Sequence, residues 1–284
     1  MFAPTPLRRT LAAALRDLKS AKAAVRASAA HDLLTVGDES PREAADALAA
    51  CLRDVDPDVR SNALAALGAL DARHLLDDIV GCLDDQEPTV RQRAVMALSD
   101  VGGARAESLV REALTHPQPD VRFQALVGVC NLDPAEGHAR SLQLLDDPDP
   151  FLAAEAADQL GLILTAEAVA PETFSDPVRA STREALARHL DDPRPGVSLR
   201  AAVSLLRLGD PRGMPRVVTF LRAREAIDGD PAALTHECLT LLGTMPEAFH
   251  PAARDVLAPI ARRWLKTEAR ERARAALERL GGRP

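Results

Sequence analysis

A period of 31 residues constrains the fold of this chain more than any other feature of its sequence. Four prolines recur at this spacing, and four aliphatic residues recur with them, two positions further along. The two series are Pro57, Pro88, Pro119 and Pro150, and Val59, Val90, Val121 and Leu152. A fixed period of this length is typical of stacked supersecondary units, because no single unit can bury its apolar face alone. The sequence therefore predicts a repeat protein.

The segment 41–70 indicates what each repeat contains. Its apolar residues recur three, four and seven positions apart along two stretches, as they do on one face of a helix. Between the stretches, Asp56 is placed to cap the second helix, and Pro57 falls in its first turn, where a missing N–H costs nothing. We therefore expect an all-α fold of stacked helical hairpins.

The pattern D-x-x-P-x-V-R-x-x-A-x-x-A-L resembles the HEAT repeat. It occurs as Asp54–Leu67, as Asp85–Leu98 and, with changes at its first and last two positions, as His116–Val129. Leu208–Val217 is similar to the HEAT-like variant named after phycobilisome lyases, in which a G-D-x-x-x-x-P turn joins successive repeats. The resemblance extends over essentially the whole chain. It implies an alpha-alpha superhelix of about eight hairpins but says little about activity, since such repeats serve scaffolds, adaptors, lyases and a hydroxylase.

We predict that residues 1–284 form a single continuous HEAT-like solenoid. After Leu152 the register slips until Pro195, which places an insertion of fourteen residues in the linker. The expected segments are a basic N-terminal hairpin over 1–36, regular repeats over about 41–164, a longer linker over about 165–176 and C-terminal repeats over 177–284.

Charge and composition limit the partners. The net charge is −7, but residues 1–26 carry +5 and residues 27–150 carry −13. The acidic surface argues against nucleic acid, and with no tyrosine few side chains are available to stack on a base. A HEAT-like DNA glycosylase, which needs such groups on a cationic surface, is therefore a less favoured alternative. A protein partner of basic or mixed charge fits better.

Location and cofactors are also predicted. No apolar run approaches the length of a membrane span, and Cys51 and Cys82 fall at equivalent repeat positions, about 8–10 Å apart and too far for a disulfide. We expect buried free thiols in a cytoplasmic protein.

A related HEAT-like family, deoxyhypusine hydroxylase, holds two irons with several His-Glu pairs. This chain has the one pair His236-Glu237, so we expect no metal and no cofactor.

Three arginines recur one repeat apart at the start of the second helices: Arg60, Arg91 and Arg122. We expect each guanidinium to pair with an acidic group near a turn, such as Asp58 or Asp120, and so to tie adjacent repeats together. The alternative is a basic stripe that binds a ligand.

The second helices of the third to fifth units are the candidate binding surface. If Val59, Ala63 and Leu67 point to the core, the outward positions of the later repeats follow from the period. They are Arg93, Met96, Phe123, Gln124, Glu155 and Asp158. Apolar anchors among polar groups are typical of an interface hot spot, although Phe123 could instead cover a gap between alanines.

These features together favour a non-enzymatic adaptor or scaffold that holds a protein partner on a concave surface. An auxiliary subunit of an enzyme system, of the bilin-lyase type, is the alternative, and Leu208–Val217 is the feature in its favour. No catalytic arrangement of residues is found in the sequence.

Overall fold

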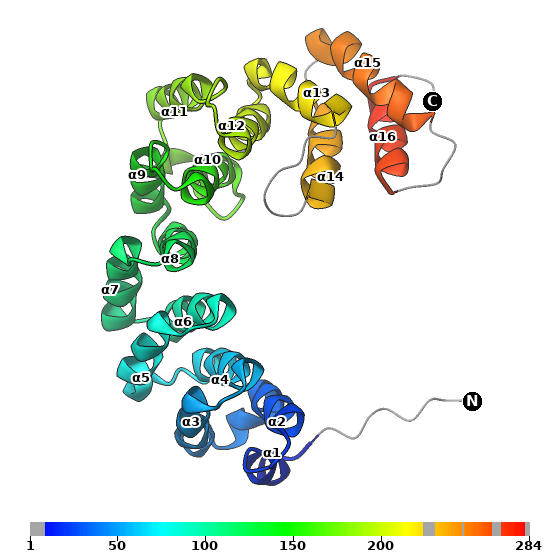
Figure 1. Ribbon diagram of the computed structural model, residues 1–284. Coiled ribbons are helices and arrows are strands. Elements are labelled where there is room, and N and C mark those ends of the chain that lie inside the picture. Colours follow the sequence, from blue (N-terminus) through cyan, green and yellow to red (C-terminus); the bar gives the residue numbers. More distant parts are fainter. Residues whose placement is uncertain (1–8, 224–230, 246, 263–267, 282–284) are drawn as a thin grey trace, which may run out of the picture. The chain divides into compact units, whose positions relative to one another are not determined.

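The structure, a computed structural model, describes residues 9–223, 231–245, 247–262 and 268–281. These residues form sixteen α-helices, several short 3-10 turns and no strand (Figure 1), which confirms the predicted all-α class. The helices follow one another as eight hairpins. None of the described helices combines the length and the apolar character that crossing a membrane requires.

The chain divides into two compact units, Met1–Leu132 and Asp133–Pro284. The helices of the first are α1 (Leu11–Asp17), α2 (Ala23–Val36), α3 (Pro41–Ala49), α4 (Pro57–Ala69), α5 (Leu76–Gly81), α6 (Pro88–Val101), α7 (Ala104–Glu112) and α8 (Pro119–Leu132). Those of the second are α9 (Pro134–Leu144), α10 (Pro150–Thr165), α11 (Asp176–Arg188), α12 (Pro195–Arg207), α13 (Met214–Ala223), α14 (Pro231–Leu242), α15 (His250–Ala261) and α16 (Glu268–Arg279). One continuous solenoid over both units stays a prediction.

Four second helices, α4, α6, α8 and α10, begin at the recurring prolines, as the sequence predicts. Pro57 opens α4, and the Asp56 carboxylate accepts hydrogen bonds from the backbone N–H groups of Asp58 and Val59. Asp149 caps α10 in the same way. Each cap satisfies N–H groups that have no partner inside the helix, so the boundary is encoded locally.

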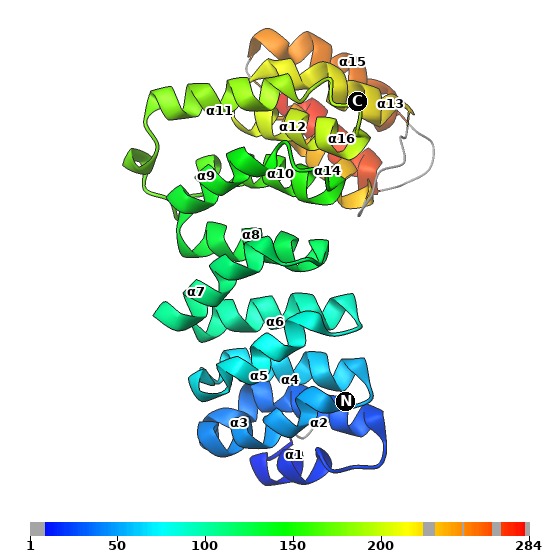
Figure 2. The ribbon, with the colours of Figure 1, turned by 60° about the vertical axis from the view of Figure 1, so that its left-hand side comes forward.

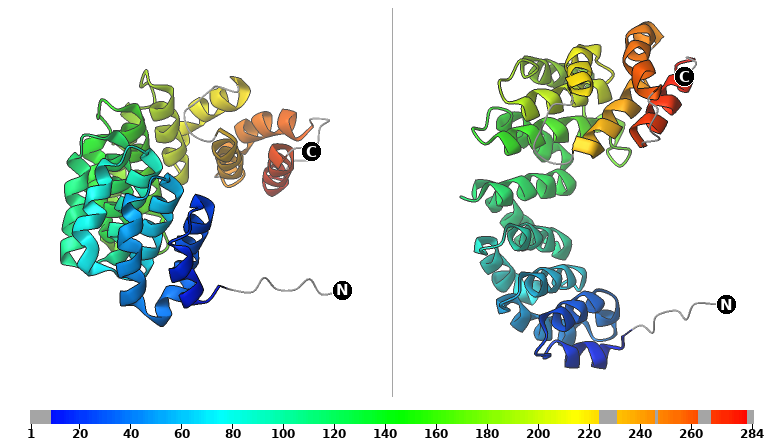
Figure 3. Two further views of the ribbon diagram at one scale, coloured as in Figure 1. Left: turned by 60° about the horizontal axis from the view of Figure 1, so that its bottom comes forward. Right: turned by 45° about the vertical axis from the view of Figure 1, so that its right-hand side comes forward.

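The second helices pack on one another within each unit. In the first unit α2, α4, α6 and α8 contact one another in order, and Figure 2 shows α4, α6 and α8 as successive layers. In the second unit α10 packs on α12, and α14 lies beside α16 (Figure 3). Residues one repeat apart are therefore brought together on neighbouring helices.

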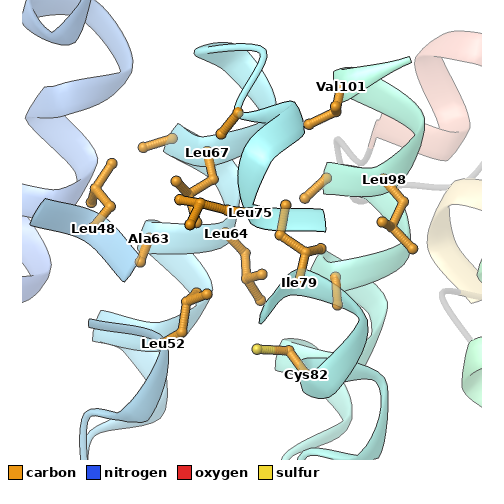
Figure 4. Close-up of a cluster of buried hydrophobic side chains, with 14 of the residues drawn as sticks. Leu48, Leu52, Ala63, Leu64, Leu67, Leu75, Ile79, Cys82, Leu98 and Val101 are labelled. Carbon is orange, nitrogen blue, oxygen red and sulfur yellow. The ribbon is translucent and has the colours of Figure 1, made fainter. Parts of the chain in front are cut away.

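The core is built from small aliphatic side chains. In Figure 4 the labelled side chains of α3, α4, α5 and α6 point toward one another, among them Leu48, Leu64, Ile79 and Leu98, all fully buried. Cys82 lies at the edge of this cluster, and burial raises the pKa of its thiol to about 11. All four cysteines are buried, as predicted.

The linker predicted at 165–176 is a loop that the second unit anchors. It runs from the end of α10 to the start of α11, with a 3-10 turn at Pro171–Thr173. Phe174 is buried, and its ring centroid lies 4.9 Å from that of His138. Arg179 donates hydrogen bonds to the carbonyls of Phe174 and Leu164. The insertion is therefore packed rather than detached.

Candidate functional site

The recurring arginines join successive hairpin turns. The Arg60 guanidinium forks onto the Asp85 carboxylate of the next repeat, with both N···O distances 2.7 Å. Its third nitrogen donates to the carbonyls of Asp54 and Val55 in its own turn, at 2.8 and 3.3 Å. One side chain thus satisfies two turn carbonyls and carries a bidentate ion pair between repeats.

Arg91 makes the same contacts one repeat later. It lies 2.9 Å from both oxygens of Asp120 and donates to the carbonyls of Asp85 and Gln86. Asp120 follows Pro119, whereas the partner of Arg60 precedes its proline by three residues. The change is explained by His116, which occupies the usual aspartate position in this repeat.

The ladder differs from the expectation in two details, the partner of Arg60 and a further arginine, Arg26. Arg60 pairs with Asp85, rather than with Asp58 of its own turn. Arg122 donates to the carbonyls of His116 and Pro117, as the other arginines do to their own turns. The sequence reasoning also omitted Arg26, which forks onto Asp54 with both N···O distances 2.6 Å. Its signal was the Val25-Arg26 pair, which repeats the Val-Arg of the later units.

Replacing Arg91 by alanine should lower the free energy of unfolding of the first unit by about 1–3 kcal/mol, because the half-buried Asp120 carboxylate and two turn carbonyls lose their donor. Arg111→Ala is the matched control, since Arg111 pairs with Glu107 one turn away on its own helix and is one-third exposed. Urea unfolding measures both variants. An equal loss in the two would contradict a cohesive role for the ladder.

The Arg26–Asp54 pair predicts a dependence on pH. The hydrogen bond from Arg26 lowers the pKa of Asp54 below its ordinary value. The pair therefore stabilises the fold above about pH 4, and this contribution is lost as the pH falls through the lowered pKa. We expect Arg26→Ala to lower the melting temperature at pH 7 and to differ less from wild type at pH 3. A constant difference across this range would exclude the linkage.

Four of the predicted binding residues lie on adjacent second helices of the first unit. Arg93 and Met96 are on α6, and Phe123 and Gln124 are on α8, which packs against α6. Met96 is 37% exposed, and the other three are half-buried. Among the described residues, Met96 is therefore the exposed large hydrophobic side chain of this pair of helices.

The other two predicted residues, Glu155 and Asp158, lie on α10 in the second unit. We expected both side chains to face outward, but Asp158 is buried. The reason is α12, whose Arg207 lies 2.7 Å and Arg200 3.3 Å from one Asp158 carboxylate oxygen. Asp158 therefore serves first to join α10 to α12.

Glu155 and Asp158 belong to a charge cluster over three second helices. Arg207 also pairs with Glu237 of α14, with its Nε 2.8 Å from the Glu237 carboxylate. We call Glu155, Asp158, Arg200, Arg207 and Glu237 the α10–α12–α14 cluster. Sequence reasoning missed its last three members because they lie outside the 31-residue register.

Glu155 is the member of the cluster with a perturbed carboxyl. Burial raises its pKa, and the nearby Asp158 charge adds to the effect. Gln159 opposes the rise by donating a hydrogen bond of 2.7 Å to a Glu155 oxygen. Arg200 and Arg207 oppose it through their charges, but among the described residues neither they nor any other cation lies within ion-pair distance of Glu155.

Two large apolar side chains flank the cluster on α10. Phe151 is 55% exposed and Leu162 is 41% exposed. Beside Phe151 lies a small pocket of about 70 Å³, which Ala154, Arg200 and Leu234 also line. The second unit therefore presents exposed apolar groups next to charged ones, as the first unit does.

Comparison with protein families shows to which family the repeats belong. The model described as HEAT repeats matches residues 8–99 and 45–130. Residues 8–130 of the chain contain HEAT repeats. None of the curated proteins matches the sequence.

Solved structures similar to this HEAT-repeat chain include YibA of Escherichia coli. The two are 14% identical with a TM-score of 0.55, over 94% of this chain and 91% of YibA, which shows a shared fold. An engineered protein is 19% identical with a TM-score of 0.45, over 96% and 79% of the two chains. The complex of CpcE and CpcF of phycocyanin lyase from Nostoc sp. PCC7120 is 18% identical with a TM-score of 0.38, over 99% of each chain.

The lyase-like motif Leu208–Val217 forms the turn between α12 and α13 of the HEAT-repeat chain. The Asp210 carboxylate accepts a hydrogen bond from the Arg212 backbone N–H and forms an ion pair with the Arg212 guanidinium. Gly209 has a φ of 72°, a conformation that favours glycine, and the buried Gly213 packs on α12. The motif therefore accounts for a turn and a close helix contact.

The two residues of the His236-Glu237 pair contact different partners. His236 lies 3.5 Å from Glu268 of α16, whereas Glu237 pairs with Arg207. Within the described residues, no three His, Cys, Asp or Glu side chains gather as a metal site would require. Trp264, the one tryptophan of the sequence, lies outside the described residues.

Proposed function

We propose that this HEAT-repeat chain is a non-catalytic adaptor that binds a protein partner on the second helices of its hairpins. One observation carries the proposal. Four large hydrophobic side chains are exposed among the described residues, and three of them, Met96, Phe151 and Leu162, lie on second helices. Exposed apolar groups beside charged ones suit protein recognition, because the apolar group supplies affinity and the charges supply specificity.

The binding residues proposed for the first unit are Arg93, Met96, Phe123 and Gln124. Their helices are held by a buried aliphatic core and by the Arg91–Asp120 pair. Such a surface needs little reorganisation on binding, which favours affinity. A reducing, cytoplasmic location suits the four buried thiols.

Truncating Phe123 to alanine should make the binding free energy of a captured partner less favourable by about 1–3 kcal/mol, because an anchor of the interface is removed. Arg93→Glu should add to the loss by reversing a charge at the same surface. The measurement is a quantitative pull-down from native lysate with mass spectrometry, with circular dichroism to verify the helical content.

Val55→Ala is the matched control. Val55 is 90% exposed, but it lies in the turn before α4 and not on a second helix. Its replacement should leave the captured proteins unchanged. If the Phe123 and Arg93 changes together also leave them unchanged, the α6–α8 surface is not the interface.

An auxiliary role in a bilin-lyase-type system is the second candidate, and it depends on Leu208–Val217. The residues of that motif have a structural task in the second unit, as described above. A bilin or phycobiliprotein gene beside this one would favour the lyase role, and its absence would favour the adaptor.

A further inference from the structure

One face of α10 carries two acidic side chains between two apolar ones. Phe151, Glu155, Asp158 and Leu162 are spaced by four, three and four residues, so they share one side of the helix. The two exposed apolar residues are about 16 Å apart along the axis, at 1.5 Å per residue. The carboxylates lie between them.

The charges near this face do not balance. Glu155, Asp158 and Glu237 are three carboxylates, whereas Arg200 and Arg207 are two guanidinium groups. Both arginines contact Asp158 and Glu237, and Glu155 is left with the neutral Gln159 amide. A half-buried carboxylate without a cation is costly, so a cation from outside would be favoured here.

We propose that this face of α10 binds a helix of a protein partner that presents an arginine or lysine between two apolar side chains. The partner's cation pairs with Glu155, and its apolar residues cover Phe151 and Leu162. The pocket beside Phe151, with Leu234 on its wall, receives one of these apolar side chains. This inference rests on the proposed adaptor function and specifies the chemistry of the partner.

An acidic partner helix does not fit the same face. It would meet the charge of Glu155 while Arg200 and Arg207 are already engaged by Asp158 and Glu237. An amphipathic helix laid along a groove is a recurring mode of recognition, and its specificity comes from the charge placed between the apolar anchors.

The affinity of this face of α10 for the partner helix should depend on pH. The groups that act on Glu155 are Asp158 and Gln159 on α10 and Arg200 and Arg207 on α12, and the two arginines also pair with Glu237 on α14. The partner's cation binds the ionised carboxylate, so affinity should fall as the pH falls through the Glu155 pKa, which burial raises above its ordinary value.

The test uses a phage-displayed library of helical peptides with one face randomised, selected on the full chain. We expect the selected helices to carry arginine or lysine between apolar residues. Their affinity should fall about tenfold for Glu155→Gln, which removes the charge but keeps the size of the side chain, and also for Phe151→Ala. Fluorescence anisotropy with a labelled selected peptide measures this, and a melting curve verifies that each variant is folded.

Val55→Ala in the first unit is the matched control, since Val55 is exposed but lies in a turn, and this variant should bind the selected peptides as wild type does. Selection of acidic or neutral helices, equal affinity for Glu155→Gln, or no selected helix would each overturn the inference. If the selected helices depend on Phe123 instead, the inference about α10 fails while the adaptor function stands. The pull-down described above decides that function separately.

Discussion

Arg207→Ala should lower the free energy of unfolding of the second unit by up to about 3–5 kcal/mol, because it leaves the buried Asp158 and the half-buried Glu237 with only the more distant Arg200 as their cation. The Arg207 side chain is 11% exposed and contacts both Asp158 and Glu237. These residues belong to α12, α10 and α14, so the change weakens three successive repeats together. Urea unfolding followed by circular dichroism measures the effect.

Arg188→Ala is the control for this change, since Arg188 is an exposed arginine on α11 of the same unit. It should alter stability by less than about 0.5 kcal/mol. Equal losses in the two variants would mean that the α10–α12–α14 cluster does not hold the repeats together.

Gly213→Ala should destabilise the second unit by about 3 kcal/mol or more, because the new methyl group would overlap the backbone of α12. A Cβ at this position would overlap the Ala202 carbonyl oxygen and lie 2.9 Å from its carbon. A backbone carbonyl cannot rotate away as a side chain can. The turn between α12 and α13 would have to separate from α12, and thermal unfolding should show a markedly lower transition.

Gly196→Ala provides the comparison within α12. A Cβ there would meet no atom within 4 Å, so stability should change by less than about 1 kcal/mol. If the two alanine variants unfold at the same temperature, the close contact at Gly213 does not contribute to the stability of the fold.

Both the arginine ladder and the α10–α12–α14 cluster join neighbouring repeats with arginine–carboxylate pairs. In the ladder Arg60 and Arg91 each have one carboxylate, and their remaining donors satisfy turn carbonyls. In the cluster two arginines share contacts with the same two carboxylates, and a third carboxylate, Glu155, stays unmatched. A structural network is complete by itself, whereas an unmatched charge beside exposed apolar groups suits a partner.

The sequence by itself determined the hairpins and their boundaries. Apolar periodicity, the cap at Asp56 and the proline at 57 act over a few residues of chain, and the structure places α4 where they indicate. The 31-residue period then repeats this local information, which is why the first unit follows the prediction closely. The family resemblance was carried by the same short-range pattern.

Only the tertiary structure decided which side chains meet. Arg207 and its partners Asp158 and Glu237 are 49 and 30 residues apart, and nothing in the register connects them. Asp158 occupies a position that the period predicted to be exposed, yet the arginines of α12 cover it. Periodicity specifies the face of a helix on which a residue lies, but burial and pairing depend on the long side chains that reach across from the neighbouring helix.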